Sequence, residues 1–298
     1  MRAVASPGCV RRLEAWLAGA GAWLERVRYA RPEAGGEVSA YRLVPRNPRG
    51  RVVSAHGAGN DALFPQVALF KALVERGFEV FAFDWDGHGA ESTTRFAPDA
   101  LDSALVAAVG EAERGRAELP LHLVGHSFGG SLVLHALACG AVPHAVSGVA
   151  VSAPIQVSPD FRTAVAELLG FLHPATLSQR AHYGVWGTVP AVGPLKRRAY
   201  PFRRGEEGGA FGYVGTVQRL LARLDLERTA AAVRAPVLLV YGTADRLVPM
   251  AQGEALAARI GGAELCRVPG GTHWSTAFLP AAVERVAAWV DARQGARA

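Results

Sequence analysis

Three residues that could together perform nucleophilic catalysis, Ser127, Asp245 and His273, each follow an apolar run with the length of a buried strand. A serine hydroxyl is a poor nucleophile near neutral pH, so it needs a base that removes its proton and an acid that orients the base. Serine, histidine and aspartate supply these roles, and their order along this chain is one in which such triads occur. The residue types therefore predict acyl transfer to Ser127, with His273 as the base and Asp245 as the orienting acid.

The segment around Ser127 has the pattern of a tight turn between a strand and a helix. An apolar run from residue 121 leads into Gly-His-Ser-Phe-Gly, and a helix-compatible segment follows. Gly125 and Gly129 leave room where a Cβ atom would collide, so Ser127 is pushed outward at the carboxyl edge of a sheet, near the positive end of a helix. An ordinary Gly/Ser turn is the simpler alternative, and the strand–turn–helix context favours a nucleophile.

Asp245 and His273 lie where loops should reach the same sheet edge. Asp245 closely follows the predicted strand 237–241, and His273 lies in the loop after the predicted strand 264–268. A turn or helix-capping role is the alternative for Asp245. Eight other histidines compete with His273 for the role of base. Each lies in a regular element, before a strand, in the irregular insertion, or in a glycine loop where a structural hydrogen bond is expected: His56, His88, His122, His126, His135, His144, His173 and His182.

A glycine-rich loop, His-Gly-Ala-Gly-Asn at residues 56–60, follows another predicted strand. Such a loop brings backbone N–H groups close to a ligand without side-chain obstruction, as an oxyanion hole requires. We expect the backbone N–H groups of Ala58 and Phe128 to hold the oxyanion. No His, Asp or Glu cluster has the spacing of metal ligands, so we expect neither a metal nor another cofactor.

The elements that position these residues alternate along the chain, which predicts an α/β fold with a mostly parallel, doubly wound sheet of about eight strands. Besides the strand before Ser127 and the helix after it, we expect strands at 38–44, 51–55, 78–83, 146–151, 237–241 and 264–268, and helices at 67–74, 99–116, 217–224, 251–260 and 281–292.

Two regions depart from this alternation. Residues 154–214 are rich in Gly, Pro and aromatic side chains, and an insertion of that length between strands predicts a helical lid or cap over Ser127. Residues 1–36 form a predicted N-terminal amphipathic helical extension, because apolar residues recur at helical spacing through about residue 27. The α/β core would then comprise residues 37–153 and 215–298. The N-terminal helix should pack on this core, although Trp16 and Trp23 could instead contact lipid or flank a substrate entrance.

The composition is that of a globular protein, with 50% hydrophobic and 19% charged residues and a mean hydropathy of +0.14. The net charge is +6, and the sequence has only one short basic patch, at 196–204, so we expect no nucleic-acid partner. The patch could instead favour an anionic substrate or a peripheral lipid surface. The three cysteines are widely separated, which favours a cytoplasmic location. Glu14 interrupts an apolar stretch that resembles an export signal, and no run is long enough to cross a membrane.

Taken jointly, these motifs resemble the α/β-hydrolase superfamily and, within it, the monoacylglycerol lipase-like and serine aminopeptidase-like branch of lipases and esterases. The resemblance covers roughly residues 38–292 and implies the same triad and the same oxyanion donors. Glu91 stands where the family usually has serine, and Ser92 follows it. The residues that carry the resemblance are His56–Gly59, Asp84, Gly87–Gly89, Gly125–Gly130, Gly242–Arg246 and His273.

These features lead to a serine hydrolase that cleaves a carboxylic ester of an apolar acid through an acyl-enzyme. An acyltransferase, a thioesterase or an amidase could use the same apparatus, and lactones are further possible substrates. A catalytically silent binding protein on the same fold is a third class, which the intact triad disfavours. A haloalkane dehalogenase or an epoxide hydrolase is disfavoured, because those relatives need aspartate at the position of Ser127. The sequence leaves the oligomeric state open.

Overall fold

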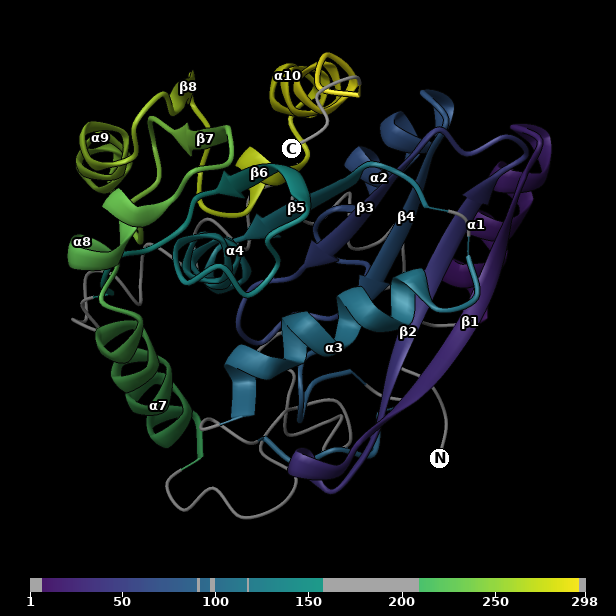
Figure 1. Ribbon diagram of the computed structural model, residues 1–298, viewed down its shortest axis with the longest axis horizontal. Helices are drawn as coiled ribbons and strands as arrows, with labels where there is room; N and C mark the ends of the chain where they lie inside the picture. Colours follow the sequence, from purple (N-terminus) through teal and green to yellow (C-terminus); the bar gives the residue numbers. More distant parts are fainter. Residues whose placement is uncertain (1–6, 90–91, 97–99, 117, 158–208, 295–298) are drawn as a thin grey trace.

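The computed structural model describes residues 7–89, 92–96, 100–116, 118–157 and 209–294. An eight-stranded sheet forms its centre (Figure 1), in the strand order β1-β2-β4-β3-β5-β6-β7-β8. The pairs β1·β2 and β2·β4 are antiparallel, and all other pairs are parallel. The strands are β1 Ala22–Arg31, β2 Gly36–Pro45, β3 Gly50–Ala55, β4 Phe78–Phe83, β5 Leu121–His126, β6 Ala145–Val151, β7 Val237–Gly242 and β8 Glu264–Val268.

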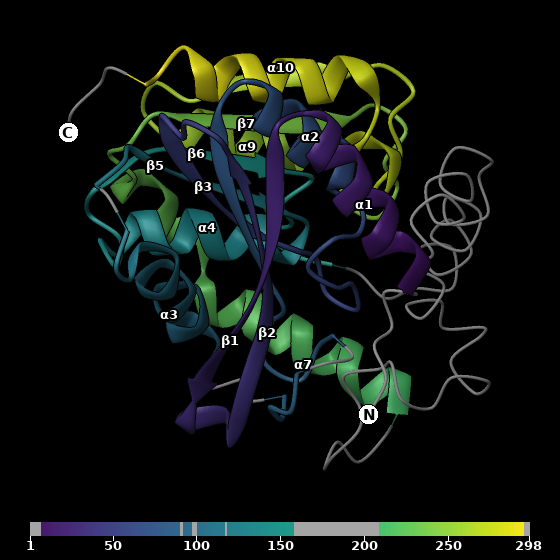
Figure 2. The same ribbon diagram turned by 90° about the vertical axis from the view of Figure 1, so that its right-hand side faces the viewer.

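Helices cover both faces of the sheet, and Figure 2 shows α1, α2 and α10 on the opposite side from α3 and α4. The described helices are α1 Pro7–Gly19, α2 Val67–Glu75, α3 Leu101–Glu113, α4 Phe128–Ala138, α7 Gly209–Leu224, α8 Leu226–Thr229, α9 Met250–Arg259 and α10 Pro280–Asp291. Short 3-10 turns lie at η1 Pro32–Ala34, η5 Ala230–Ala232 and η6 Ser275–Ala277.

The core consists of two apolar layers, one on each face of the sheet. Val52 and Val53 are neighbours in β3 and are both fully buried, Val52 with α1, α2 and α10, and Val53 with α3, α4, α7, α8 and α9. Successive side chains of a strand point to opposite faces, so a strand covered on both sides must be apolar throughout. This explains the continuous apolar runs in the sequence, and the doubly wound architecture is confirmed.

The predicted helical extension over residues 1–36 is wrong beyond Gly19. The helix ends there, Gly21 takes a left-handed φ of 70°, and β1 begins at Ala22. All ten residues of β1 pair antiparallel with β2. Leu24 and Val27 continued the helical spacing only by coincidence, because long-range strand pairing overrides a short local period.

The predicted lid falls mostly outside the described residues, which omit 158–208. One of its boundaries can be compared with the structure. The helix expected from residue 217 begins at Gly209 as α7, so the boundary at 215 falls inside a helix. The role of residues 154–214 as a lid stays a prediction.

A buried ion cluster joins three strands at the amino edge of the parallel sheet, opposite the edge that carries Ser127. Glu79 Oε1 accepts hydrogen bonds from Arg42 Nη1 at 3.0 Å and Arg51 Nε at 2.8 Å. The three residues are 1 to 3% exposed. Removing one partner of such a pair leaves the remaining charge buried and uncompensated.

Replacing Glu79 with Gln should therefore lower the free energy of unfolding by about 3–5 kcal/mol. Urea denaturation would measure the loss. The exposed pair Arg267–Glu254 is a matched control, with its nitrogen and oxygen 2.9 Å apart and its side chains 55% and 51% exposed. Glu254→Gln should change stability by less than about 1 kcal/mol. Equal effects of the two substitutions would contradict this account of the cluster.

Candidate active site

Ser127 occupies a strained turn between β5 and α4. Its φ of 54° and ψ of −127° lie in a region that non-glycine residues rarely adopt, and 9% of the residue is exposed. A Cβ atom on Gly125 would lie 2.3 Å from the carbonyl oxygen of Gly129, and one on Gly129 would lie 2.3 Å from that of Ala55. Only glycine fits at these two positions, as the sequence pattern predicted, and the strain at Ser127 costs about 1–3 kcal/mol.

The three predicted residues come together at the carboxyl edge of the sheet. His273 Nε2 lies 2.9 Å from Ser127 Oγ, and His273 Nδ1 lies 3.0 Å from Asp245 Oδ2. Ionised carboxylates only accept hydrogen bonds, so Nδ1 carries the proton, and Nε2 is left to accept one from the serine hydroxyl. The side chains of His273 and Asp245 are 4% and 0% exposed. The arrangement can transfer a proton from Ser127 to His273.

Asp245 is held ionised in this arrangement. Its Oδ1 accepts hydrogen bonds from the backbone N–H groups of Leu247 at 3.0 Å and Val248 at 2.8 Å. Burial alone would raise the pKa of the carboxyl. The charge and hydrogen bond of His273 and the hydrogen bond from the Val248 N–H outweigh burial and lower that pKa below its ordinary value.

Ser152 directly follows β6, which lies between the strands that lead to Ser127 and Asp245. The sequence did not mark this residue as functional. Its φ is 47°, and the residue is fully buried. The preceding Val151 carbonyl accepts a hydrogen bond from the Ser127 N–H at 2.8 Å. Its place after a buried strand was the one sequence signal that could have identified this residue.

Two histidines fix the glycine-rich loop, as their placement in glycine turns suggested. His56 Nε2 accepts a hydrogen bond from the Trp85 N–H at 3.1 Å, and its Nδ1 lies 2.7 Å from the Gly57 carbonyl oxygen. His88 Nε2 accepts one from the Gly59 N–H at 3.2 Å. These bonds tie the loop to the turn after β4, and the loop thereby holds a fixed backbone beside Ser127.

Of the two expected oxyanion donors, Phe128 directly follows the nucleophile, and Ala58 directly follows Gly57, where an added Cβ atom would lie 3.0 Å from Ser127 Cβ. Phe128 is the first residue of α4, so its N–H has no acceptor within the helix. Within the part of the chain that the structure describes, neither backbone N–H donates a hydrogen bond to another backbone group. Both donors therefore remain available to a ligand, and their role in binding an oxyanion stays a prediction.

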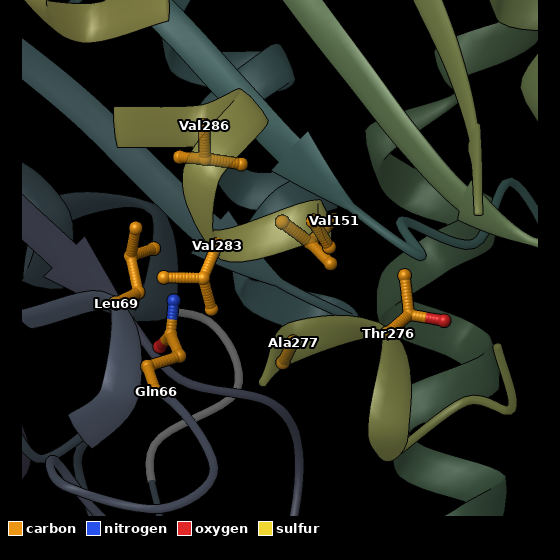
Figure 3. A pocket seen from close by; sticks show the side chains of 8 residues that line it. Gln66, Leu69, Val151, Thr276, Ala277, Val283 and Val286 are labelled. Atoms are coloured by element: carbon orange, nitrogen blue, oxygen red, sulfur yellow. The ribbon is translucent and has the colours of Figure 1, made fainter. Parts of the chain in front are cut away.

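One aromatic ring borders the site, and a second, buried ring packs against it. The Trp274 ring lies 5.9 Å from the His273 ring and 5.8 Å from the Phe64 ring, measured between centroids. An apolar crevice lies between α2 and α10 (Figure 3). Its lining side chains belong mostly to the core layer on that face, so it is part of the packing: Gln66, Leu69, Val151, Thr276, Ala277, Ala282, Val283 and Val286.

Two features of the described residues bear on other functions. No group of three or more His, Cys, Asp or Glu side chains in that part of the chain could hold a metal ion. Likewise, no helix among those residues combines the length and apolar character needed to cross a membrane.

Comparison with known proteins agrees with this geometry. The family model described as Serine aminopeptidase, S33, matches residues 46–276, which is most of the chain. The chain belongs to this family. It is an α/β hydrolase of the branch that includes monoacylglycerol lipases and esterases, and it is therefore a hydrolytic enzyme. The family and the fold class expected from the sequence motifs are confirmed.

Individual relatives place the chain within that branch. It is 32% identical to a monoacylglycerol lipase of Mycolicibacterium smegmatis over 226 residues, or 72% of this chain and 76% of that protein. It is 30% identical to a pimeloyl-[acyl-carrier protein] methyl ester esterase of Xanthomonas campestris pv. campestris, over 69% and 82% of the two chains. A soluble variant of monoglyceride lipase from Saccharomyces cerevisiae shares the fold, with a TM-score of 0.65, 19% identity, and coverage of 91% and 96%.

Acid should destabilise this protein strongly, because four fully buried histidines, His56, His88, His122 and His126, resist protonation. Burial is the largest cause in each: it lowers the pKa of His88 and His122 to about 4 and of His126 to about 3, and it lowers that of His56 well below its ordinary value. In the unfolded chain these four histidines bind protons from about pH 6.5 downward, whereas in the folded chain they stay neutral until the pH is much lower. The free energy of unfolding should therefore fall by about 1.4 kcal/mol per histidine and pH unit below pH 6.5.

Urea denaturation at pH 7.5, 6.5, 5.5 and 5.0 would measure this slope. His122→Gln removes one of the four groups and should make the slope shallower by about one proton. A stability that stays constant from pH 6.5 to 5.0 would contradict the burial of these rings in their neutral form.

Proposed function

We propose that this protein is a serine hydrolase that cleaves carboxylic esters of apolar acids through an acyl-enzyme intermediate. The observation that carries the proposal is the continuous hydrogen-bond chain from Ser127 Oγ through His273 to Asp245, with distances of 2.9 and 3.0 Å. The strained backbone of Ser127 presents the hydroxyl at the sheet edge, so little reorganisation is needed before reaction.

In the proposed first half-reaction, His273 Nε2 takes the proton from Ser127 as Oγ attacks the ester carbonyl carbon. The carbonyl oxygen becomes an oxyanion that accepts hydrogen bonds from the backbone N–H groups of Ala58 and Phe128. His273 then gives its proton to the leaving alkoxide oxygen, the C–O bond breaks, and the alcohol departs. The acyl group remains on Ser127 as an ester.

The second half-reaction uses the same groups with water as the nucleophile. His273 removes a proton from water as the water oxygen attacks the acyl-enzyme, and the proton then passes to Ser127 Oγ as the free acid leaves. Asp245 stays ionised throughout and stabilises the imidazolium that forms at each step. Its two backbone donors and its lowered pKa support this role.

Several observations support an apolar acyl group. The Trp274 ring lies beside the His273 ring, 5.9 Å away between centroids, and ring surfaces favour hydrocarbon over charged groups. The relatives named as monoacylglycerol lipase and methyl ester esterase support ester hydrolysis by this chain.

We also propose a cytoplasmic location, which the free thiols of Cys139 and Cys266 support.

Substitution of Ser127 should separate catalysis from folding. Ser127→Ala should lower kcat for a p-nitrophenyl ester by about 10⁴-fold or more, because no nucleophile remains. Ser127→Gly should be equally inactive but more stable by about 1 kcal/mol, because glycine adopts this φ without strain. Steady-state kinetics and thermal unfolding would measure the two effects. Retained ester hydrolysis by purified, folded Ser127→Ala would contradict the mechanism.

Substrate preference should follow the apolar border of the site. In a series of p-nitrophenyl esters from acetate to decanoate, kcat/KM should rise with acyl length before reaching a plateau or an optimum. Each additional buried methylene contributes about 0.8 kcal/mol, or roughly fourfold. A matched pair of neutral and carboxylate-terminated esters of equal length would serve as the control. Preference for the charged ester would overturn the assignment of an apolar acyl substrate.

A further inference from the structure

A second histidine contacts the catalytic machinery without belonging to the proposed triad. His126 is the last residue of β5, directly before Ser127, and is fully buried. Its Nε2 lies 2.9 Å from the backbone carbonyl oxygen of His273. The rings of the two histidines are 5.2 Å apart between centroids. One side chain thus connects the strand that carries the nucleophile to the loop that carries the base.

The chemistry of this contact fixes the tautomer of His126. A carbonyl oxygen only accepts hydrogen bonds, so Nε2 must carry the proton and Nδ1 must hold a lone pair. Nδ1 is buried and has no hydrogen-bond partner among the described residues. Burial, followed by the charge of His273, lowers the pKa of His126 to about 3. The ring is therefore neutral at working pH, and its one N–H group is committed to the backbone of His273.

The base needs such support because it lies in a loop, five residues beyond the end of β8. Neighbouring positions in this loop are held by other bonds. The Gly271 carbonyl oxygen accepts the Ala244 N–H at 2.9 Å, and the Thr272 carbonyl oxygen accepts the Thr276 hydroxyl at 2.6 Å. The contact from His126 extends this series of bonds to the backbone of His273 itself.

The opposite edge of the His126 ring faces the glycine-rich loop. A Cβ atom on Gly57 would lie 3.2 Å from His126 Nδ1 and 3.0 Å from Ser127 Cβ. The ring therefore lies between the base loop and the glycine-rich loop, bonded to the first and close enough to the second to leave no room for a side chain at residue 57.

We propose that His126 is a positioning residue of this hydrolase. Its Nε2–H holds the backbone of His273 so that the imidazole keeps both Ser127 and Asp245 within hydrogen-bond distance. The inference rests on the proposed function, because it assigns a task only if His273 acts as the base. His126 neither touches the substrate nor transfers a proton in this scheme.

Three substitutions test whether the N–H donor matters. In His126→Gln, the amide nitrogen reaches about as far as Nε2 and can donate to the same carbonyl oxygen. In His126→Asn the amide is too short to reach, and in His126→Leu no donor remains. We expect Gln to retain at least a third of wild-type kcat. Asn and Leu should lower kcat by about 10- to 100-fold, as expected for a small misplacement of a catalytic group, with KM within about twofold of wild type.

His122 provides a matched control on the same strand. It is four residues upstream, fully buried and neutral, and its Nδ1 contacts Ser147 Oγ at 2.9 Å, away from the triad. His122→Leu and His122→Asn should lower thermal stability as much as the corresponding His126 variants while leaving kcat within about twofold of wild type.

The outcomes separate this inference from the proposed function. If wild-type protein neither hydrolyses p-nitrophenyl esters nor reacts with a fluorophosphonate, the proposed function fails. If wild type is active and Gln, Asn and Leu at position 126 have equal kcat, the positioning role alone is wrong. The Gln and Asn pair decides the question even if His126→Leu does not fold, because both amides are polar and smaller than or similar in size to histidine.

Discussion

The active site depends first on the backbone of Ser127, which is held at a φ of 54° against its own preference. Two flanking glycines and one backbone hydrogen bond impose this conformation. Gly125 and Gly129 allow the strand and the helix to approach within distances that no Cβ would permit. The Ser127 N–H bonds to the Val151 carbonyl oxygen at 2.8 Å, which fixes the turn against β6. The cost of the strain is met by the packing of β5 and α4 in the core, and the result is a hydroxyl presented outward at the start of a helix.

The parallel sheet supplies the second constraint, because it collects distant parts of the chain at one edge. His273 and Ser127 are 146 positions apart in sequence and meet at 2.9 Å. Each lies just beyond the carboxyl end of a strand, as does Asp245, so the order β5-β6-β7-β8 brings their loops together. The ion cluster around Glu79 stabilises the opposite edge of the sheet. The buried ion pairs and the proposed catalytic residues therefore lie at opposite ends of the parallel strands.

The sequence predicts that Ser127, Asp245 and His273 meet at one sheet edge, because strand ends are visible as apolar runs and a Gly-x-Ser-x-Gly turn has few physical alternatives. It predicts the N-terminal region poorly, because Leu24 and Val27 fit a helical period while their strand is specified by pairing with β2. It gives little information about His126, whose contact with the His273 carbonyl oxygen exists only after folding, or about Ser152, which the strand order β5-β6-β7 places between the two site loops. Residues that touch through the tertiary structure leave no local pattern.

The central claim, that Ser127 is an activated nucleophile, is tested most directly by locating a covalent adduct. Folded wild-type protein would be treated with a fluorophosphonate, digested and analysed by peptide mass spectrometry, with urea-denatured protein treated in parallel. The account predicts one phosphonyl group per chain, on the peptide that carries Ser127, and none in the denatured sample. An adduct on a different serine, or ester hydrolysis that continues in protein fully modified at Ser127, would contradict it.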